Sequence, residues 1–238
     1  HEDEVTLGKI SNCENNGNIT IDADMNDNDS VFRIAGIICY SRAETSDLVN
    51  NGNITISSRL YNADANAYML CVAGVVAYKG TKAITNAKNT GDITFSGSIE
   101  TSSGATTAVK DACRLNLGGV LGFGNGVCGS ELYNEGDITI DGASIAGQLR
   151  MGGVVGQANA KITTGGNSGN ILIKGTSSVG SQLILGGIAG YVGENTTFTG
   201  CLNTGNNSCV LDGQVCITGN GAGVTTGIDL LPRTGENG

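Results

Sequence analysis

A seven-residue pattern, Asn-x-Gly-Asn/Asp-Ile-Thr-Ile/Phe, recurs along almost the whole length of this 238-residue chain. Its copies, of which the last two are looser, begin at Asn15, Asn50, Asn89, Asn134, Asn167 and Asn203. Successive copies are 35, 39, 45, 33 and 36 residues apart. Units of this length that keep one order are typical of repeat proteins, in which each unit covers the apolar face of its neighbour.

A second block lies between the copies and consists of an apolar residue, Ala/Gly-Gly and a small-to-apolar run. It occurs at residues 34–38, 72–76, 117–121, 151–155 and 185–189. In the first block, isoleucine and threonine alternate, as in a half-buried strand. The second block has the composition of a strand that packs closely against another backbone. With a shorter segment before each asparagine, we expect three short strands in every cycle.

These observations predict an all-β fold, a parallel β-solenoid (β-helix) of about six coils built from repeats of 33–45 residues. The 39 glycines lack the triplet period of collagen and make a helical bundle improbable. A β-propeller is the alternative, because its blades have a similar repeat length. We expect the solenoid to span residues 1–223 and a tail to span 224–238.

The asparagine that opens each copy predicts a structural device. If each cycle is one coil, equivalent residues lie about 4.8 Å apart along the axis. The side-chain amides can then bond from coil to coil and satisfy polar groups that would each cost about 1–3 kcal/mol if buried alone. We therefore expect an asparagine ladder, made of Asn15, Asn50, Asn89, Asn134, Asn167 and Asn203.

Three longer stretches, 22–29, 57–67 and 96–116, all fall between a first and a second block. They should project from the same side of the solenoid and form its binding surface. In the first stretch, oxygen-bearing side chains at alternating positions suit Ca²⁺, although the pattern is not an EF-hand. A solvated polar loop is the alternative. The candidate binding residues are Asp22, Asp24, Asn26, Asp27 and Asp29.

The repeats resemble a known type. Units of Asn-x-Gly-x-Ile followed by Gly-Gly-Val/Ile-x-Gly are similar to the GLUG-type repeats of bacterial cell-surface proteins. The match is best at 134–156 and 167–190, extends over roughly residues 9–210, and is weakest in the first two copies, which have Ala35 and Ala73 in place of glycine. The resemblance implies an exported solenoid of an adhesin-like protein, with a host glycan or extracellular protein as partner and no catalytic residue in the repeats.

The tail carries a second resemblance. Its residues Leu231, Pro232, Arg233, Thr234 and Gly235 match the Leu-Pro-x-Thr-Gly sorting signal of Gram-positive surface proteins, although the hydrophobic segment and basic end that should follow are absent. The resemblance implies sortase as a partner, cleavage between Thr234 and Gly235, and anchoring to the cell wall. We therefore expect an extracellular location.

The inventory of chemical groups argues against an enzyme. The only histidine is His1, so triads that need a histidine base are not available. Asp92 and Asp137 could serve a polysaccharide-cleaving β-helix, but asparagine takes the same repeat position in other copies, which favours a turn role. The row Thr20, Thr55, Thr94 and Thr139 is shared with ice-binding solenoids and is also ordinary for solvent-facing strands.

Charge and cysteine usage narrow the partners. The formal charge of -9 does not suit nucleic-acid binding, and no apolar run is long enough to insert into a membrane. Eight cysteines allow many pairings; we expect buried packing for Cys13, Cys39 and Cys201, and disulfides that involve Cys201, Cys209 and Cys216 stay open. We predict an adhesion domain without a resident cofactor, with a rigid stalk as the alternative.

Overall fold

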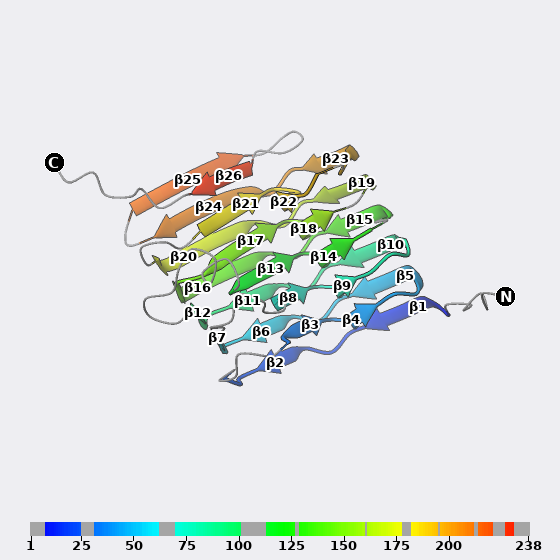
Figure 1. Ribbon diagram of the computed structural model, residues 1–238, viewed down its shortest axis with the longest axis horizontal. Helices are drawn as coiled ribbons and strands as arrows, with labels where there is room; N and C mark the ends of the chain where they lie inside the picture. The colour runs from blue at the N-terminus through cyan, green and yellow to red at the C-terminus, as the bar shows by residue number, and fades with distance from the viewer. Residues whose placement is uncertain are drawn as a thin grey trace.

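The computed structural model describes residues 8–24, 31–61, 70–100, 113–126, 129–159, 161–177, 182–194, 196–211, 214–220 and 227–230. All regular secondary structure within these ranges is β-strand. The strands of successive coils stack along one axis and form four sheets that run along it (Figure 1). Neighbouring strands from successive coils are parallel. This confirms the parallel β-solenoid and excludes the propeller.

The four sheets are named A to D in the order in which the chain visits them. Sheet A contains β1 (Lys9–Asn15), β5 (Glu44–Asn50), β10 (Ile84–Asn89), β15 (Ser130–Asn134), β19 (Ile162–Asn167) and β23 (Phe198–Asn203). Sheet B contains β2 (Ile19–Ile21), β6 (Ile54–Ile56), β11 (Ile93–Phe95), β16 (Ile138–Ile145), β20 (Ile171–Ser177) and β24 (Asn206–Leu211), and the short β7 (Arg59–Tyr61) and β12 (Ser98–Glu100) extend it sideways.

The other two sheets come from the second block of the repeat. Sheet C contains β3 (Arg33–Ala35), β8 (Leu70–Ala73), β13 (Arg114–Gly118), β17 (Gln148–Gly152) and β21 (Gln182–Gly186). Sheet D contains β4 (Ile38–Ser41), β9 (Val76–Lys79), β14 (Leu121–Asn125), β18 (Val155–Asn159) and β22 (Ala189–Val192). The expectation of three strands in each cycle is therefore wrong, because the second block turns at its paired glycines and gives two strands.

Five coils contain a strand of all four sheets, and β23 and β24 begin a sixth, close to the number predicted. The last strands then reverse direction. β25 (Gln214–Asn220) pairs antiparallel with β24, and β26 (Gly227–Leu230) pairs antiparallel with β21. These two strands cover the C-terminal edges of sheets B and C.

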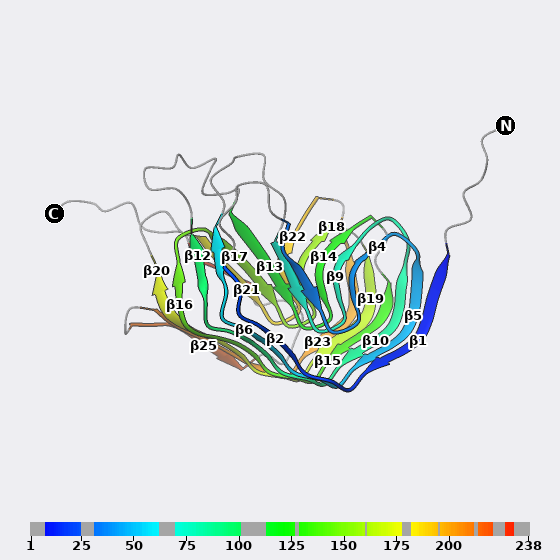
Figure 2. The same ribbon diagram turned by 90° about the horizontal axis from the view of Figure 1, so that it is seen from below.

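Seen along the axis, sheets A and B form a curved outer layer, and sheets C and D form a V inside it (Figure 2). Apolar side chains between sheets B and C make one core cluster, and those between sheets A and D make a second. The Gly-Gly turn that joins C to D meets the Asn-x-Gly turn that joins A to B. At this meeting point, a Cβ on Gly153 would lie 2.2 Å from the backbone oxygen of Gly187 and 2.4 Å from Cγ of Asn167.

The asparagines at this meeting point form a continuous ladder. They pair in register from strand to strand, and Nδ2 of each donates to Oδ1 of the asparagine in the next coil at 2.7–2.8 Å. The same Nδ2 also donates to the backbone oxygen two residues later, for example from Asn89 to Gly91. Asn50 and Asn89 are fully buried, so the ladder satisfies amides inside the protein.

A second regular feature is a left-handed residue in every strand of sheet A, three positions before the ladder asparagine. The φ angles of Asn12, Asp47, Asn86, Glu131, Thr164 and Gly200 are 55, 56, 50, 60, 61 and 65°. The pairing of β1 with β5 skips Asn12 and Asp47, passing from Ser11–Ser46 to Cys13–Leu48. One residue is skipped on each strand, so the register is kept and the left-handed residues lie at the same place in each coil.

Candidate functional site

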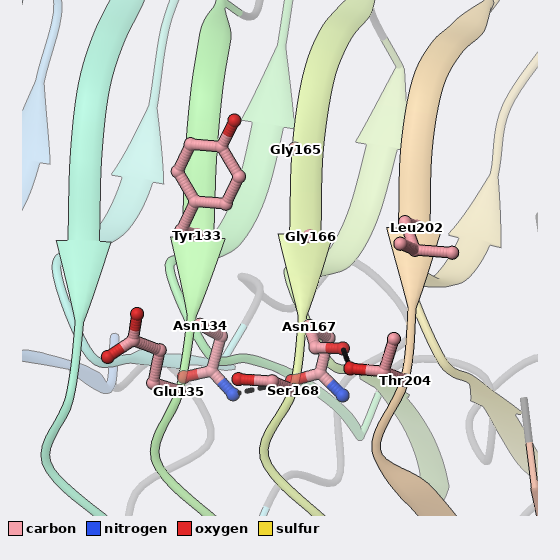
Figure 3. Close-up of a pocket in the computed structure, with 9 residues that line it drawn as sticks. All are labelled: Tyr133, Asn134, Glu135, Gly165, Gly166, Asn167, Ser168, Leu202 and Thr204. Carbon is pink, nitrogen blue, oxygen red and sulfur yellow. Dashed lines mark hydrogen bonds between the residues drawn. The ribbon is translucent and has the colours of Figure 1, made fainter. Parts of the chain in front are cut away.

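An open hollow lies on the outer face of sheet A (Figure 3). Lys88, Tyr133, Gly166 and Leu202 occupy one outward position in successive coils, as their strand registers show. Because Gly166 has no side chain, a gap of about 190 Å³ opens between the tyrosine and the leucine. We call this gap the sheet A slot.

The walls of the sheet A slot are apolar and open to solvent. Tyr133 is 40% exposed and Leu202 is 51% exposed, so both are large hydrophobic side chains without full cover. A Cβ on Gly166 would lie 3.4 Å from the Tyr133 ring and 3.2 Å from the backbone oxygen of Leu202. Any side chain in place of the glycine would therefore narrow the slot.

Polar groups line the lower end of the slot, where sheet A turns into sheet B. Glu135, Ser168 and Thr204 follow the ladder asparagines of three successive coils, and Figure 3 shows them in one row. Their backbone N–H groups bond to the preceding coil, so the row is held in register. The Glu135 carboxylate also forms an ion pair with Lys88 at 2.8 Å. A ligand in the slot would meet an aromatic ring, hydroxyl groups and a carboxylate.

The scaffold beneath the slot is rigid. Asn134 and Asn167 lie directly below the polar row, and Nδ2 of Asn134 donates to Oδ1 of Asn167 at 2.7 Å. Both asparagines are 1% exposed. Because backbone and side chains are bonded in both directions, the slot is preorganised rather than formed on binding, which reduces the entropy lost by a ligand complex.

Sequence reasoning did not single out the slot. The sequence feature that could have revealed the slot is an exception within the repeat. Gly165 and Gly166 occupy the positions at which the neighbouring coils have Leu132 and Tyr133 or Cys201 and Leu202. Reading the segment before each asparagine in register would have shown two missing side chains in one coil. Which of them faces solvent depends on the fold.

The predicted acidic site is only partly within the described residues. Asp22 is exposed, and Oδ1 of Asp24 accepts a hydrogen bond from the backbone nitrogen of Arg59 at 3.2 Å. Asn26, Asp27 and Asp29 lie outside the described residues. Among those that are described, no three His, Cys, Asp or Glu side chains converge in a way that could hold a metal ion.

The three excursions share one edge as far as they are described. The backbone nitrogen of Ala23 donates to Oγ of Ser58 at 3.3 Å, which joins the first to the second. Tyr61 and Glu100 pair in register, which joins the second to the third. The central parts of these excursions, the sorting motif Leu231–Gly235 and the expected domain boundary at 223/224 lie outside the described residues.

Asp92 and Asp137 belong to a second, exposed ladder at the A-to-B turn. Oδ1 of Asp92 accepts from the backbone nitrogen of Asp137 at 2.8 Å, and Oδ1 of Asp137 accepts from that of Asn170 at 2.7 Å. Asn18 and Asn53 make the same bond. This bond needs only a side-chain oxygen as acceptor, which explains why both asparagine and aspartate occur at this position of the repeat.

The cysteines differ in their surroundings. Cys201 and Cys209 are both buried, and no disulfide joins one to the other. Burial raises the pKa of Cys71 to about 12 and also raises that of Cys201. Cys39 is exposed, which corrects the expectation of buried packing: it lies on the edge strand β4, whereas the corresponding Ala77 of the next coil is covered on both sides. Cys216 lies in a strand whose side chains are outside the described set.

Comparison with protein-family models, curated proteins and solved structures found no match to this chain. Within the described ranges, the structure contains no helix that is long and apolar enough to span a membrane. The fold and the site therefore define the protein class as a β-solenoid with a solvent-open apolar slot on its outer layer.

Proposed function

We propose that this chain is a non-catalytic binding domain of a bacterial cell-surface protein, which adheres to a glycan or an extracellular protein. The sheet A slot is the observation that carries the proposal, because it combines an exposed aromatic ring with hydroxyl groups on a preorganised surface. The resemblance to GLUG-type repeats supports an extracellular location, and the sortase-like motif supports anchoring to the cell wall.

Binding of the purified chain to an array of host glycans and matrix proteins, with and without Ca²⁺, tests this proposal. The variant Tyr133→Ala should weaken at least one reproducible interaction by about tenfold or more, the usual size of an aromatic contact at the centre of a site. Gly166→Ala should also weaken it by narrowing the slot. Val192→Ala, a change of an equally exposed apolar residue on sheet D, is the matched control and should have no effect.

Two results would contradict the proposal. One is the absence of any interaction with a protein whose circular dichroism and melting curve show that it is folded. The other is that Tyr133→Ala and Gly166→Ala leave every observed interaction unchanged. A Ca²⁺-dependent interaction that survives both variants would move the site to the acidic excursion.

The alternative function is a rigid stalk that holds another domain away from the cell wall. The continuous asparagine ladder favours this alternative, because it joins all six coils with directional bonds. The two functions are compatible, since a stiff scaffold also presents a binding slot. Sortase-catalysed attachment of the full chain to an oligoglycine amine would test the anchoring step, with Thr234→Ala as the variant expected to abolish it.

A further inference from the structure

Two arginines surround one tyrosine at the N-terminal end of the inner layer. Arg33 lies on β3, Tyr40 lies on β4, and Arg42 follows β4 in the same coil, at the lower end of the solenoid in Figure 1. Cζ of Arg33 is 4.9 Å from the centre of the Tyr40 ring, and Cζ of Arg42 is 5.7 Å from it. We call these three residues the Arg-Tyr cluster.

The cluster carries positive charge without a matching carboxylate. In the described part of the chain, ion pairs are formed by Arg59, Lys88 and Lys174, and neither Arg33 nor Arg42 takes part in one. Nε of Arg33 is also buried without a hydrogen-bond partner. Although the chain has a net charge of -9, the ion pairs among its described residues leave both of these arginines out. Their guanidinium groups keep their hydrogen-bonding capacity for an external anion.

The fold fixes the cluster in place. Tyr40, Tyr78 and Phe123 follow one another in register on sheet D, and each ring centre is 5.1 Å from the next. The guanidinium of Arg33 also lies 4.7 Å from the Tyr78 ring, so two rings hold it. The Tyr78 ring, in turn, packs against buried Cys71, Ala77 and Phe123.

One side of the cluster is accessible. β4 is the edge strand of sheet D, and Tyr40 is 42% exposed, whereas Phe123, at the same position two coils later, is 2% exposed. Arg42 is exposed as well. A third cation lies nearby, because Nζ of buried Lys79 donates to the backbone oxygen of Ala43, next to Arg42. Arg33, Arg42 and Lys79 therefore place three basic side chains near one edge of the inner layer.

We propose that the Arg-Tyr cluster binds an acidic saccharide. The guanidinium groups of Arg33 and Arg42 donate to the carboxylate or sulfate oxygens of the sugar, in the forked geometry that arginine provides. The exposed part of the Tyr40 ring packs against the apolar face of the pyranose. This site lies on the inner layer, so it is separate from the sheet A slot and does not depend on it.

The test measures binding of the full chain to three polysaccharides, namely heparin for sulfate, hyaluronan for carboxylate, and dextran as a neutral reference. Heparin, hyaluronan or both should bind, and dextran should not. Arg42→Gln and the double variant Arg33→Gln/Arg42→Gln should weaken binding at least tenfold and make the affinity less dependent on salt. The affinity of Arg42→Lys should lie between those of the wild type and Arg42→Gln, because lysine keeps the positive charge but cannot form two parallel hydrogen bonds with the anion.

Two control variants and one further variant of the cluster separate this site from other causes. Arg59→Gln removes an arginine that is already paired with Glu100, and it should leave binding nearly unchanged. Tyr133→Ala should also leave it unchanged, whereas Tyr40→Ala should reduce it. Arg42 is exposed, so its single variants keep the test valid even if the double variant does not fold.

The proposal is overturned if neither acidic polysaccharide binds, or if Arg59→Gln weakens binding as much as Arg42→Gln does, because the effect would then be general charge. It is also overturned if Tyr133→Ala abolishes binding while the arginine variants do not, which would assign the saccharide to the sheet A slot. If no interaction depends on Tyr133, the proposal for the sheet A slot fails, but the proposal for the Arg-Tyr cluster is unaffected. The two proposals can therefore fail separately.

Discussion

The side chain of Asn89 donates from Nδ2 to Oδ1 of Asn134 at 2.8 Å, although the two residues are 45 positions apart. Nδ2 of Asn89 also donates to the backbone oxygen of Gly91, while its Oδ1 accepts from Asn50. Asn89 therefore uses an amide donor and an amide acceptor at the same time. This double use distinguishes the buried ladder from the exposed one at Asp92, where only an oxygen takes part.

The first prediction concerns this difference. Asn89→Ala should lower the free energy of unfolding by about 2–4 kcal/mol, because it removes the acceptor of one Nδ2–H of buried Asn50 and the donor to Oδ1 of buried Asn134. Asn89→Asp should cost at least as much, since a carboxylate cannot donate to Gly91. Asp92→Asn should change stability by less than about 0.5 kcal/mol. Urea unfolding of the three variants tests this, and equal losses would show that the buried ladder has no special role.

The second prediction compares two glycines at the same position of the repeat motif. A Cβ on Gly91 would lie 2.0 Å from the backbone oxygen of Gly52 in the preceding coil, whereas the nearest atom to a Cβ on Gly17 is Oδ1 of Asn15 at 3.6 Å. Gly91→Ala should therefore destabilise strongly, by about 3 kcal/mol or more, because backbone must move. Gly17→Ala should stay within about 1 kcal/mol. Thermal unfolding of both variants checks the difference, and similar melting temperatures would contradict it.

The third prediction is a stabilising substitution. Thr164 has φ of +61°, a conformation that costs a β-branched residue about 1–2 kcal/mol. Asparagine tolerates it better and already takes the same place at Asn12 and Asn86. Thr164→Asn should raise stability by about 1 kcal/mol. Thr163→Asn, one residue earlier in the strand, is the control and should not stabilise. A lower melting temperature for Thr164→Asn would show that the threonine makes a compensating contact.

The fourth prediction follows from the pKa of the Cys71 thiol, which burial raises to about 12 from an ordinary value of 9.0. Between these values, the folded chain keeps a proton that the unfolded chain loses. Stability is therefore unaffected below pH 9 and falls as the pH rises from 9 toward 12, by at most about 1.4 kcal/mol for each pH unit. Cys71→Ala should make this fall shallower in urea titrations between pH 8 and 11.

Thiol labelling gives an independent check of the same prediction. At pH 8, the exposed Cys39 should react with a small disulfide reagent in the folded protein, whereas Cys71 should react only after unfolding. Mass spectrometry of labelled peptides distinguishes the two. Equal labelling rates in the folded protein would contradict the burial of Cys71.

Much of the fold could be predicted because the same sequence pattern occurs in several copies. The spacing of the opening asparagines gives the length of each coil, and the alternation around Thr94 and Thr139 gives one sheet with the correct inward face. The split of the second block was missed, since Gly118 and Gly119 are consistent with a continuous, closely packed strand as well as with a turn. The left-handed positions were also hidden, because Glu131 and Thr164 are not residues that favour φ above zero.

The candidate sites were less predictable than the fold. The sheet A slot depends on which of two glycines faces solvent, and the Arg-Tyr cluster joins Arg33 and Tyr40 from two sheets. The slot comes from a glycine that departs from the repeat, and the cluster comes from the place of Tyr40 on the edge strand of sheet D. Sequence reasoning looked for function in the long excursions instead, because insertions are visible without knowledge of the fold.

The sequence by itself determined the period, the parallel stacking and the identity of the ladder residues, because a residue repeated at coil spacing must meet its own copy in the next coil. Only the tertiary structure decided what each copy contacts. Gly17 and Gly91 have the same local motif, but only Gly91 has the Gly52 backbone against it. Tyr40 and Phe123 share one register, but only Tyr40 lies on an edge strand and reaches solvent. The residues that a side chain contacts in the next coil depend on the position of its own coil in the stack. The sequence of a single repeat does not contain that information.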